Sequence, residues 1–298
     1  MIVYNVCPAC GNKNIQPVFS ARDHTVSHES FEIWECKECT LRFTQNIPEI
    51  DAIGKYYQSD NYISHSDTAK GFINNLYHKV RKRTLGQKKN LVSNITGKNS
   101  GKILDVGCGT GAFLQTMKIS GWDITGLEPD ENARNKAIEL YNIHPLPANA
   151  FYGLPDHSFD AITLWHVLEH VHDLHGYMKK FKNLLAPGGK LFIAVPNYTS
   201  YDAGFYKEFW AAYDVPRHLY HFSPKAMKSL WVAHGLRVQQ MKPMWFDSVY
   251  VSMLSEKYKK GPSHAAVGFF SGTISNLKAM MNVERCSSVI YCGEESKQ

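Results

Sequence analysis

The sequence predicts an α/β fold in which helices cover both faces of a mostly parallel sheet, preceded by a small cysteine-held module. From Lys102 onward, apolar segments typical of buried strands alternate with amphipathic segments of helical spacing. The stretch Ile103–Leu114, ILDVGCGTGAFL, has the order strand, glycine turn, helix, which is the layout of a nucleotide-binding crevice. Two Cys-x-x-Cys pairs stand near the start, in a segment too short to bury a core without a staple.

Length and composition restrict the function classes. The chain has 298 residues and a net charge of +6, which allows one large α/β domain with a small accessory unit. No run of eighteen apolar residues predicts a membrane span, and the start, MIVYNVCPAC, lacks the features of a signal peptide, so we expect a cytoplasmic protein. The densest basic cluster, Lys79–Lys89, is either a solvated helix face or a patch for an anionic substrate. The sequence leaves the oligomeric state open.

The four cysteines near the start predict a metal site. Each Cys-x-x-Cys pair places two thiolates a short turn apart, and the two pairs together supply the tetrahedral ligand set of a structural Zn²⁺: Cys7, Cys10, Cys36 and Cys39. The β-prone segments 31–35 and 41–44 flank the second pair as a hairpin would. The alternative is a set of reduced cysteines that fill a small core. We expect a zinc ribbon over residues 1–48, a helical connector over 49–100 and the α/β domain over 101–298.

The glycine turn carries the prediction of the ligand. Gly107, Gly109 and Gly111 also satisfy the loose dinucleotide fingerprint, and a dehydrogenase with a nicotinamide cofactor is therefore an alternative. However, Asp105 stands two residues before the first glycine, where a carboxylate would repel a pyrophosphate and suits a ligand with a cationic end. S-adenosylmethionine has an ammonium and a sulfonium. The run Asp105–Gly111 resembles motif I of the class I S-adenosylmethionine-dependent methyltransferases.

That resemblance implies a Rossmann-like, seven-stranded sheet and further cofactor contacts. Glu128 ends the second strand, 23 residues after Asp105, close to the spacing at which a carboxylate accepts hydrogen bonds from ribose hydroxyls. Cys108 belongs to the glycine turn, and Asn149 stands where relatives often carry an acid that contacts adenine. The turn Ala186–Gly189 and the strand after it resemble the family's segment that follows motif IV. The last strand, 287–291, would be inserted antiparallel, and we expect the chain from Cys292 onward to be loose.

The run His166–Val171, HVLEHV, resembles a segment that in similar methyltransferases places the first histidine beside the cofactor. Its pattern H-x-x-E-H also matches an inverted zinc-peptidase signature, but that motif lies inside a long helix and this one follows a strand. A divalent metal held by Glu169 and His170 is a further alternative, because some methyltransferases have a related E-x-x-E-H run. We favour a structural role for these two residues.

Residues 198–224 bear on the acceptor. In similar methyltransferases this segment lies over the active-site mouth, so His218 is our candidate general base, with packing as an equal alternative. Arg217 would hold an anionic substrate or pair with Asp214. His221 is a weaker substrate candidate, because HFSP predicts a helix start capped by Ser223 with Pro224 in the first turn. In the connector, Tyr57 and Tyr62 would line the site or serve as packing aromatics.

We therefore expect methyl transfer from S-adenosylmethionine by direct displacement to a small-molecule, sugar-linked or lipid-linked acceptor. A second reading is an RNA methyltransferase that uses the zinc ribbon and Lys79–Lys89, although no base-positioning motif stands where Trp165-His166 does. A third is a non-enzymatic zinc-ribbon docking protein with a vestigial methyltransferase domain. The dehydrogenase reading leaves HVLEHV unexplained.

Overall fold

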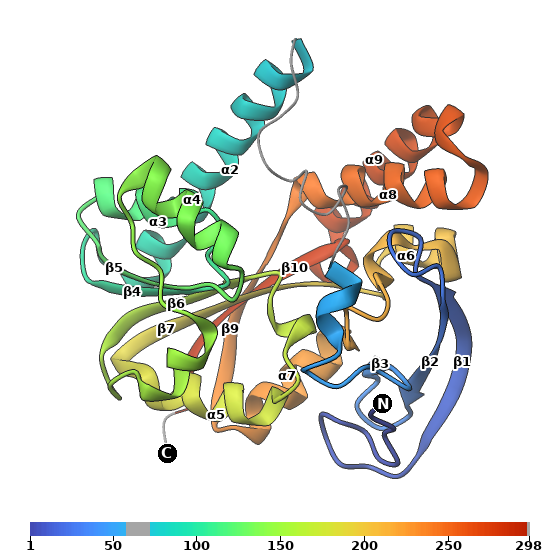
Figure 1. Cartoon of the computed structure of the whole chain (residues 1–298), viewed down its shortest axis with the longest axis horizontal. Helices are drawn as coiled ribbons and strands as arrows, with labels where there is room; N and C mark the ends of the chain where they lie inside the picture. Colours follow the sequence, from blue (N-terminus) through green and yellow to red (C-terminus); the bar gives the residue numbers. More distant parts are fainter. Residues whose placement is uncertain (58–71, 297–298) are drawn as a thin grey trace.

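A central sheet with helices on both faces forms the main body of the protein. The structure is a computed structural model that describes residues 1–57 and 72–296, with the side chains of 72–82 and of Pro262 left undescribed. The sheet has the order β5-β4-β6-β7-β10-β9. Its strands are β4 (Lys102–Val106), β5 (Asp123–Leu127), β6 (Phe159–Trp165), β7 (Leu185–Pro196), β9 (Leu236–Pro243) and β10 (Ser288–Glu295). Figure 1 shows this sheet across the molecule, with α2, α3 and α4 on one side and α5 and α7 on the other.

The helices follow the strands as the α/β pattern predicts. Those around the sheet are α2 (Phe72–Thr96), α3 (Ala112–Ile119), α4 (Glu131–Tyr141), α5 (Leu174–Leu184) and α7 (Pro224–Ala233). Between β7 and α7 lies α6 (Tyr201–Tyr206), and between β9 and β10 lie α8 (Trp245–Lys260) and α9 (Ala265–Met281). Short 3₁₀ turns are η1 (Ile53–Tyr57), η2 (Ala148–Gly153), η3 (Leu168–His170), η4 (Lys207–Phe209), η5 (Ala211–Tyr213), η6 (Pro262–His264) and η7 (Val283–Arg285). The start of α7 confirms the prediction, because Ser223 caps it and Pro224 stands in its first turn.

Alternating side chains of the strands feed two apolar layers. On β7, Leu191, Ile193 and Val195 face the core shared with α5 and α7. Phe192 and Ala194 of the same strand face the second core, which includes Phe113 and Met117 of α3. All of these β7 side chains are fully buried. A central strand apolar on both faces is typical of a parallel sheet covered on both sides, as the sequence predicted.

The sheet has six strands in the described residues, so the expectation of seven strands was wrong. The segment around Leu146 makes only an isolated parallel bridge to Leu127. Two backbone bonds hold it: Leu146 N–H donates to Gly126 O at 2.8 Å, and Glu128 N–H donates to Leu146 O at 3.0 Å. Prolines 145 and 147 flank this residue and have no N–H to donate, so the ladder stops after one pair.

The prediction of a loose tail from Cys292 onward was also wrong. β10 lies antiparallel between β7 and β9, as expected of the last strand, but it runs on to Glu295. Cys292, predicted to begin a loose tail, is fully buried and pairs with Phe192 on one side. Glu294 forms ion pairs with Lys190 and Arg237 of the neighbouring strands. The polar residues that suggested a tail are therefore cross-strand partners at a sheet end.

The N-terminal residues build a second sheet that the α/β part completes. β1 (Ile15–Arg22), β2 (Ser30–Cys36) and β3 (Arg42–Thr44) are antiparallel, and the two-residue strand β8 (Tyr220–His221) pairs with β3. The cysteine residues Cys7, Cys36 and Cys39 share one buried cluster with residues of β7 and α7. The pairing of β2 with β3 confirms the expected hairpin, whereas β1 and β8 were not predicted. The domain boundaries 1–48, 49–100 and 101–298 stay a prediction.

Candidate active site

The glycine turn joins the carboxyl end of β4 to α3. Gly107 and Gly109 have φ angles of 69° and 54°, which an L side chain rarely adopts. A Cβ atom on Gly107 would lie 2.5 Å from Val167 Cγ2, so the HVLEHV run packs directly on the turn. At Gly109 no described atom lies within 4 Å of the corresponding point. The turn is therefore closed toward Val167 and open at Gly109, where a ligand can approach the backbone.

Glu128 stands at the end of the neighbouring strand and reaches the same turn. One of its carboxylate oxygens accepts the Gly109 N–H at 2.7 Å, and the other accepts the Asp130 N–H at 3.0 Å. The side chain is 8% exposed, and burial raises its pKa. This carboxylate lies at the open part of the turn, with lone pairs that the two amides do not exhaust. It suits the hydroxyl pair of a ribose.

Asp105 is buried below the turn and is 1% exposed. Thr163 of β6 donates its hydroxyl proton to Asp105 Oδ1 at 2.6 Å. Burial nevertheless raises the pKa of Asp105 to about 7, because Thr163 and the nearby cation of Lys88 only partly offset the loss of water. A buried carboxylate with a raised pKa is stabilised in its ionised form when a positive group approaches. The cationic end of S-adenosylmethionine is such a group.

Lys88 of α2 is a site residue that the sequence interpretation missed. Its ammonium lies 4.3 Å from the centroid of the Trp165 ring, and burial lowers its pKa. The carboxylates of Asp105 and Asp247 oppose that shift. The helical spacing could have indicated this, because position 88 falls on the same face of α2 as the packed residues Leu85, Val92 and Ile95. One lysine of the predicted basic cluster therefore faces the site rather than solvent.

His166 follows β6 with a φ of 60° and lies between two carboxylates. Its Nδ1 atom lies 3.2 Å from Glu169 Oε1, and its Nε2 atom lies 2.8 Å from Asp247 Oδ2 at the start of α8. Burial lowers the pKa of His166, but the two carboxylates outweigh it and raise the pKa to about 10. The imidazole is thus a cation that donates from both nitrogens. Asp247 was not predicted as a site residue.

Comparison with known proteins agrees with this geometry. A family model described as a methyltransferase domain matches residues 77–241, more than half of the chain. The chain belongs to the class I S-adenosylmethionine-dependent methyltransferases. The dehydrogenase alternative is therefore wrong.

Three similar proteins illustrate the relationship. The human mitochondrial Ubiquinone biosynthesis O-methyltransferase is 32% identical over 165 residues, which cover 49% of this chain and 44% of that protein. Demethylmenaquinone methyltransferase of Tropheryma whipplei is 34% identical over 96 residues, 31% of this chain and 40% of that protein. The chain thus spans less than half the length of these relatives. The structure of Haemonchus contortus phosphoethanolamine N-methyltransferase 2 with S-adenosyl-L-methionine is 16% identical, covers 86% of this chain and 62% of that one, and has a TM-score of 0.53, which shows the fold alone.

Behind the glycine turn of this methyltransferase, His170 and His218 are oriented by backbone carbonyl groups. His170 Nδ1 lies 3.0 Å from Arg217 O, and His218 Nδ1 lies 2.8 Å from Ala212 O. Because a carbonyl oxygen only accepts, each Nδ1 carries a proton, and in the neutral form of each ring Nε2 is the nitrogen with the lone pair. The buried Glu169 Oε2 has no hydrogen-bond partner among the described residues. Ligand atoms of Glu169, His170 and His218 lie within 4.8 Å of one another, a spacing that could hold a metal ion.

The residues predicted to bind the acceptor divide into two groups. Tyr57 lies at the histidine cluster, with its hydroxyl 3.1 Å from His170 Nδ1. Tyr62 lies outside the described residues. His221 is 3% exposed in β8, where its Nε2 meets Thr44 Oγ1 at 3.1 Å, so its side chain is buried in the N-terminal sheet. Asn149 is exposed in η2, and its adenine contact stays a prediction.

For Arg217 the structure contradicts the anionic-substrate interpretation. The side chain is 1% exposed and its guanidinium donates to five protein acceptors. Two belong to Asp214, which bears out the predicted alternative, and the others are Asp23 Oδ1, Thr25 Oγ1 and the carbonyl oxygen of Tyr56. The arginine therefore ties the β1–β2 loop to the segment after β7.

The four cysteines of the N-terminal sheet converge as predicted. Their sulfur atoms all lie within 4.8 Å of one another, with Cys7 and Cys39 3.5 Å apart and Cys10 and Cys36 3.6 Å apart. A tetrahedral Zn²⁺ with Zn–S bonds of about 2.3 Å needs sulfur separations of about 3.8 Å, so the set fits. The hydrogen bond from the Cys39 thiol lowers the pKa of Cys7 to about 5, whereas the same bond raises the pKa of Cys39, so one thiolate of this pair is favoured.

The second cysteine turn is anchored to the α/β part. Thr40, directly after Cys39, has a φ of 62°, which is uncommon for a residue with a side chain. Its hydroxyl lies 2.6 Å from the Ser223 hydroxyl at the start of α7, and its carbonyl accepts the Tyr198 hydroxyl at 2.6 Å. The geometry of the cysteine cluster and the segment between β7 and α7 are thus coupled by direct contacts.

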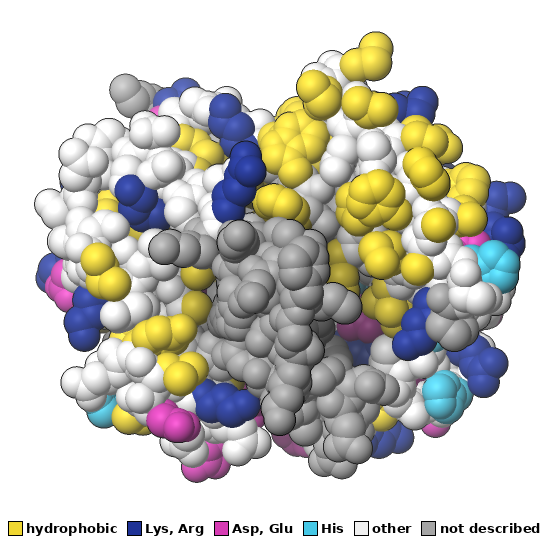
Figure 2. Space-filling view, turned by 90° about the horizontal axis from the view of Figure 1, so that it is seen from above, with side chains coloured by type: hydrophobic (Ala, Val, Ile, Leu, Met, Phe, Trp, Pro, Cys, Tyr) yellow, Lys and Arg dark blue, Asp and Glu magenta, His cyan; other side chains and the backbone are white. Residues whose placement is uncertain are grey.

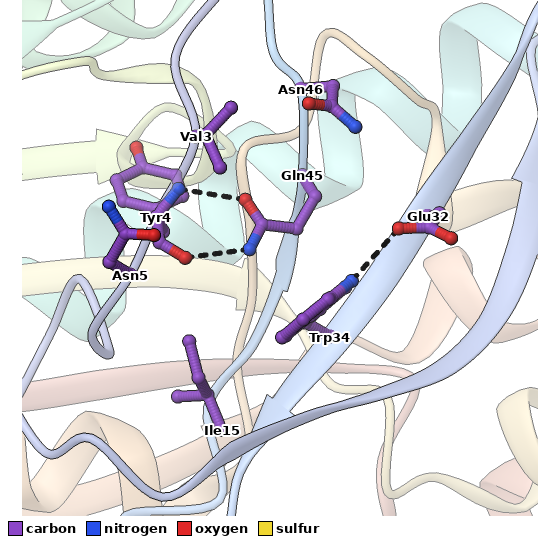
Figure 3. A pocket seen from close by; sticks show the side chains of 8 residues that line it. All are labelled: Val3, Tyr4, Asn5, Ile15, Glu32, Trp34, Gln45 and Asn46. Atoms are coloured by element: carbon purple, nitrogen blue, oxygen red, sulfur yellow. Dashed lines mark hydrogen bonds between the residues drawn. The ribbon is translucent and has the colours of Figure 1, made fainter.

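A separate pocket of about 220 Å³ lies on the N-terminal module (Figure 3). Gln45 makes two hydrogen bonds of 2.8 Å to the backbone N–H and carbonyl of Tyr4, and the Trp34 indole N–H donates to Glu32 at 3.1 Å. These lining groups satisfy one another, and no lining residue belongs to the central sheet. We assign no ligand to this pocket.

Proposed function

We propose that this methyltransferase moves the methyl group of S-adenosylmethionine to a small-molecule acceptor by in-line displacement. The observation that carries the proposal is the pair of carboxylates at the ends of adjacent strands, with Glu128 on the Gly109 amide and Asp105 buried below the turn. The cofactor supplies a methyl group on a sulfonium, which is a good leaving group. The chain then has to align donor and acceptor and exclude water.

Each cofactor contact has a physical role in this proposal. Asp105 balances the positive end of the cofactor, and Glu128 accepts the ribose hydroxyls. Gly107, Cys108, Gly109 and Gly111 give the backbone its close approach. Asn149 would contact adenine, and His166, fixed by Glu169 and Asp247, forms the wall beside the turn.

Proton removal from the acceptor is assigned to His218. Nδ1 donates to Ala212 O, so in the neutral ring Nε2 carries the lone pair that would take a proton from a hydroxyl acceptor. Tyr57 lies on the adjacent His170 and would border the acceptor. A divalent cation at Glu169, His170 and His218 is an alternative use of the same groups.

The acceptor proposed is a quinone-type ring with a free hydroxyl. The support comes from the names of the matched relatives, which act in ubiquinone biosynthesis and on demethylmenaquinone. Sugar-linked and lipid-linked acceptors belong to the same coarse class of small hydroxylated molecules. The zinc of the cysteine cluster is proposed as structural, because four thiolates leave no open coordination position.

The direct test is methyl transfer from radiolabelled S-adenosylmethionine to three acceptor sets: hydroxylated quinone precursors, nucleotide sugars and total RNA. We expect label only in small molecules, and most in the hydroxylated rings. A His218→Ala protein that binds S-adenosylhomocysteine normally should lose most of that transfer. Label in RNA alone would overturn the small-molecule proposal.

Nothing in the described part of the chain favours the RNA or docking alternatives. Lys88 of the predicted basic cluster lies on Trp165, which removes it from an RNA-facing surface. The intact carboxylates and glycine turn argue against a vestigial domain. RNA binding that weakened steeply with salt would reopen the first alternative.

A further inference from the structure

The helices α8 and α9 form a hairpin between the last two strands of the sheet (Figure 1). They are antiparallel, because a Cβ atom on Gly268 would lie 2.5 Å from Met253 Cα and one on Gly272 would lie 2.5 Å from Val249 Cα. The two backbones thus touch at the glycines. The described helices include none that is long and apolar enough to cross a membrane.

The hairpin has an inverted distribution of side chains. Small residues are buried where the helices meet each other and where they pack on the α6–η5 segment, which Ser255 contacts at the Ala211 N–H and Ser275 at Asp202. They are Ser248, Ser252 and Ser255 of α8, and Gly268, Ser271, Gly272, Ser275 and Ala279 of α9. Large apolar residues point outward instead, with exposed fractions of 66% for Phe270, 58% for Leu277 and 89% for Met281. Small residues inside and large apolar residues outside are the arrangement of helices packed in lipid. In water this outer face is unfavourable.

Exposed apolar residues lie on both helices of the hairpin. Phe246, Tyr250 and Met253 recur at helical spacing on α8, and Phe270, Ile274, Leu277 and Met281 do so on α9. Figure 2 shows hydrophobic side chains gathered over this half of the molecule. Scattered apolar residues are ordinary on a protein surface, but exposed apolar residues that recur along two packed helices mark a contact surface.

The exposed charges of the hairpin are all positive among its described side chains. Lys257, Lys259, Lys260 and Lys278 are exposed, and the first three stand at the tip, next to the start of α9. Lys260 pairs with Glu256 at 3.6 Å, and the ammonium groups of Lys259 and Lys278 lie 5.3 and 5.1 Å from aromatic rings of α6. The two acids do not face outward, since Glu256 is 1% exposed and Asp247 is bound to His166. Aromatic and aliphatic side chains beside lysines are the composition that binds an anionic lipid surface.

The base of the hairpin opens toward the active site. A cavity of about 220 Å³ lies between α2 and the start of α8, lined among others by Lys88, Leu91, Met244, Trp245 and Asp247. Lys88 and Asp247 also face Trp165 and His166 of the site. The apolar face and the site are thus connected through the first turn of α8.

We propose that the outer face of the α8–α9 hairpin binds the surface of an anionic phospholipid bilayer. The apolar side chains enter the headgroup region and the tip lysines contact lipid phosphates. A consequence, which rests on the proposed function, is that the acceptor is a membrane-resident molecule that reaches the site past the base of α8.

The test is sedimentation of the full chain with vesicles, without cofactor or acceptor. We expect binding to mixed phosphatidylcholine and phosphatidylglycerol vesicles and much weaker binding to pure phosphatidylcholine. The double variant Phe270→Glu, Leu277→Glu should lose binding by about tenfold or more. Lys257→Glu should weaken binding to the mixed vesicles selectively. The matched control is Ile119→Glu with Val232→Glu, which changes residues that are 77% and 70% exposed on α3 and α7 and should leave binding unchanged.

Two results would overturn the proposal. One is a vesicle result against the face: the wild type does not bind vesicles, or the Phe270→Glu, Leu277→Glu variant binds them as well as the wild type does. The other is a wild-type dimer that the hairpin variant converts to a monomer, with no vesicle binding, which would assign the face to a second copy of the chain. Calorimetric titration of the same variants with S-adenosylhomocysteine separates this outcome from a failure of the proposed function, because hairpin variants should bind it like the wild type.

Discussion

His166 and Asp247, 81 residues apart in the chain, meet at 2.8 Å beside the glycine turn. The contact fixes the start of α8 to the end of β6 and leaves His166 as a cation against Glu169, whose side chain is fully buried. Removing that cation should leave a buried carboxylate unpaired. We expect His166→Ala to lower the free energy of unfolding by about 3–5 kcal/mol. Asp247→Asn keeps an acceptor at a partly exposed position and should lower the free energy of unfolding by less. Urea titration of both variants measures the two losses. Equal losses would contradict this ranking.

Asp105 should make cofactor binding pH-dependent. Burial raises its pKa to about 7, and only the ionised form balances the cationic end of the cofactor. Affinity for S-adenosylmethionine should therefore be highest above pH 7 and fall as the pH drops through that value. Calorimetric titration one pH unit above and below checks this. An affinity that is the same at both pH values would contradict the assignment of Asp105 to the cationic end of the cofactor.

The same residue should limit the stability of the cofactor-free protein. The unfolded chain loses the Asp105 proton near pH 3.9, whereas the folded chain keeps it to about 7, so this group makes folding less favourable as the pH rises between them. Asp105→Asn should stabilise the cofactor-free protein at pH 8 by ~1 kcal/mol or more, since one pKa unit corresponds to about 1.4 kcal/mol. It should also abolish cofactor binding. Stability that stays equal or falls at pH 8 would count against the buried anion.

Arg217 should act on folding rather than on the substrate. Arg217→Met leaves Asp23 buried without its cation and should cost about 3–5 kcal/mol in chemical denaturation. The control, Arg237→Met, removes a half-exposed ion pair with Glu294 and should cost ~1 kcal/mol or less. A normal unfolding curve for Arg217→Met together with a raised KM would instead restore the substrate role.

His218 should affect turnover and not cofactor binding. Loss of a general base reduces kcat by roughly 10²–10⁴-fold, and His218→Ala should show a reduction in this range. S-adenosylhomocysteine binding in the same variant should match the wild type. His221→Ala serves as the comparison, because that side chain lies in β8 and should alter stability rather than the chemical step. Unchanged kcat in His218→Ala would remove the base from the account.

Zinc should stabilise the whole chain, not the N-terminal sheet alone. The cysteines share one buried cluster with β7 and α7, and Thr40 contacts Ser223 directly. Cys36→Ser should lose the bound zinc and lower the melting temperature in a single transition. Cys292→Ser, a buried cysteine outside the cluster, should keep one zinc per chain. Full zinc content in Cys36→Ser would contradict the four-cysteine site.

Much of the α/β fold could be predicted from the sequence because its signals are local. The glycine turn, the amphipathic spacing of α3, α5 and α7, and the cap of α7 each lie within a few residues. The lack of a seventh strand in the described residues also has a local cause, because two prolines flank Leu146, but the family resemblance implies seven strands. The predicted last strand ended too early, at Tyr291, because the last residues of β10 are polar.

The site could be predicted only where it is built from one segment. Asp105, Glu128 and the glycines follow from strand ends and spacing. The partners of Arg217 and His166 depend on contacts across 194 and 81 residues, which no local pattern encodes. α8 was not predicted, and with it Asp247 and the apolar hairpin face were missed. Its pattern is small residues inside and large apolar residues outside, the reverse of the rule by which buried faces are recognised.

The most direct test of the central claim is calorimetric titration of the zinc-loaded protein with S-adenosylhomocysteine, with NAD as control and Glu128→Gln as variant. We expect micromolar binding of S-adenosylhomocysteine, no binding of NAD, and an affinity at least tenfold weaker in Glu128→Gln, whose amide is a poorer acceptor for two ribose hydroxyls. Binding of neither ligand by the wild type, or equal binding by Glu128→Gln, would contradict it.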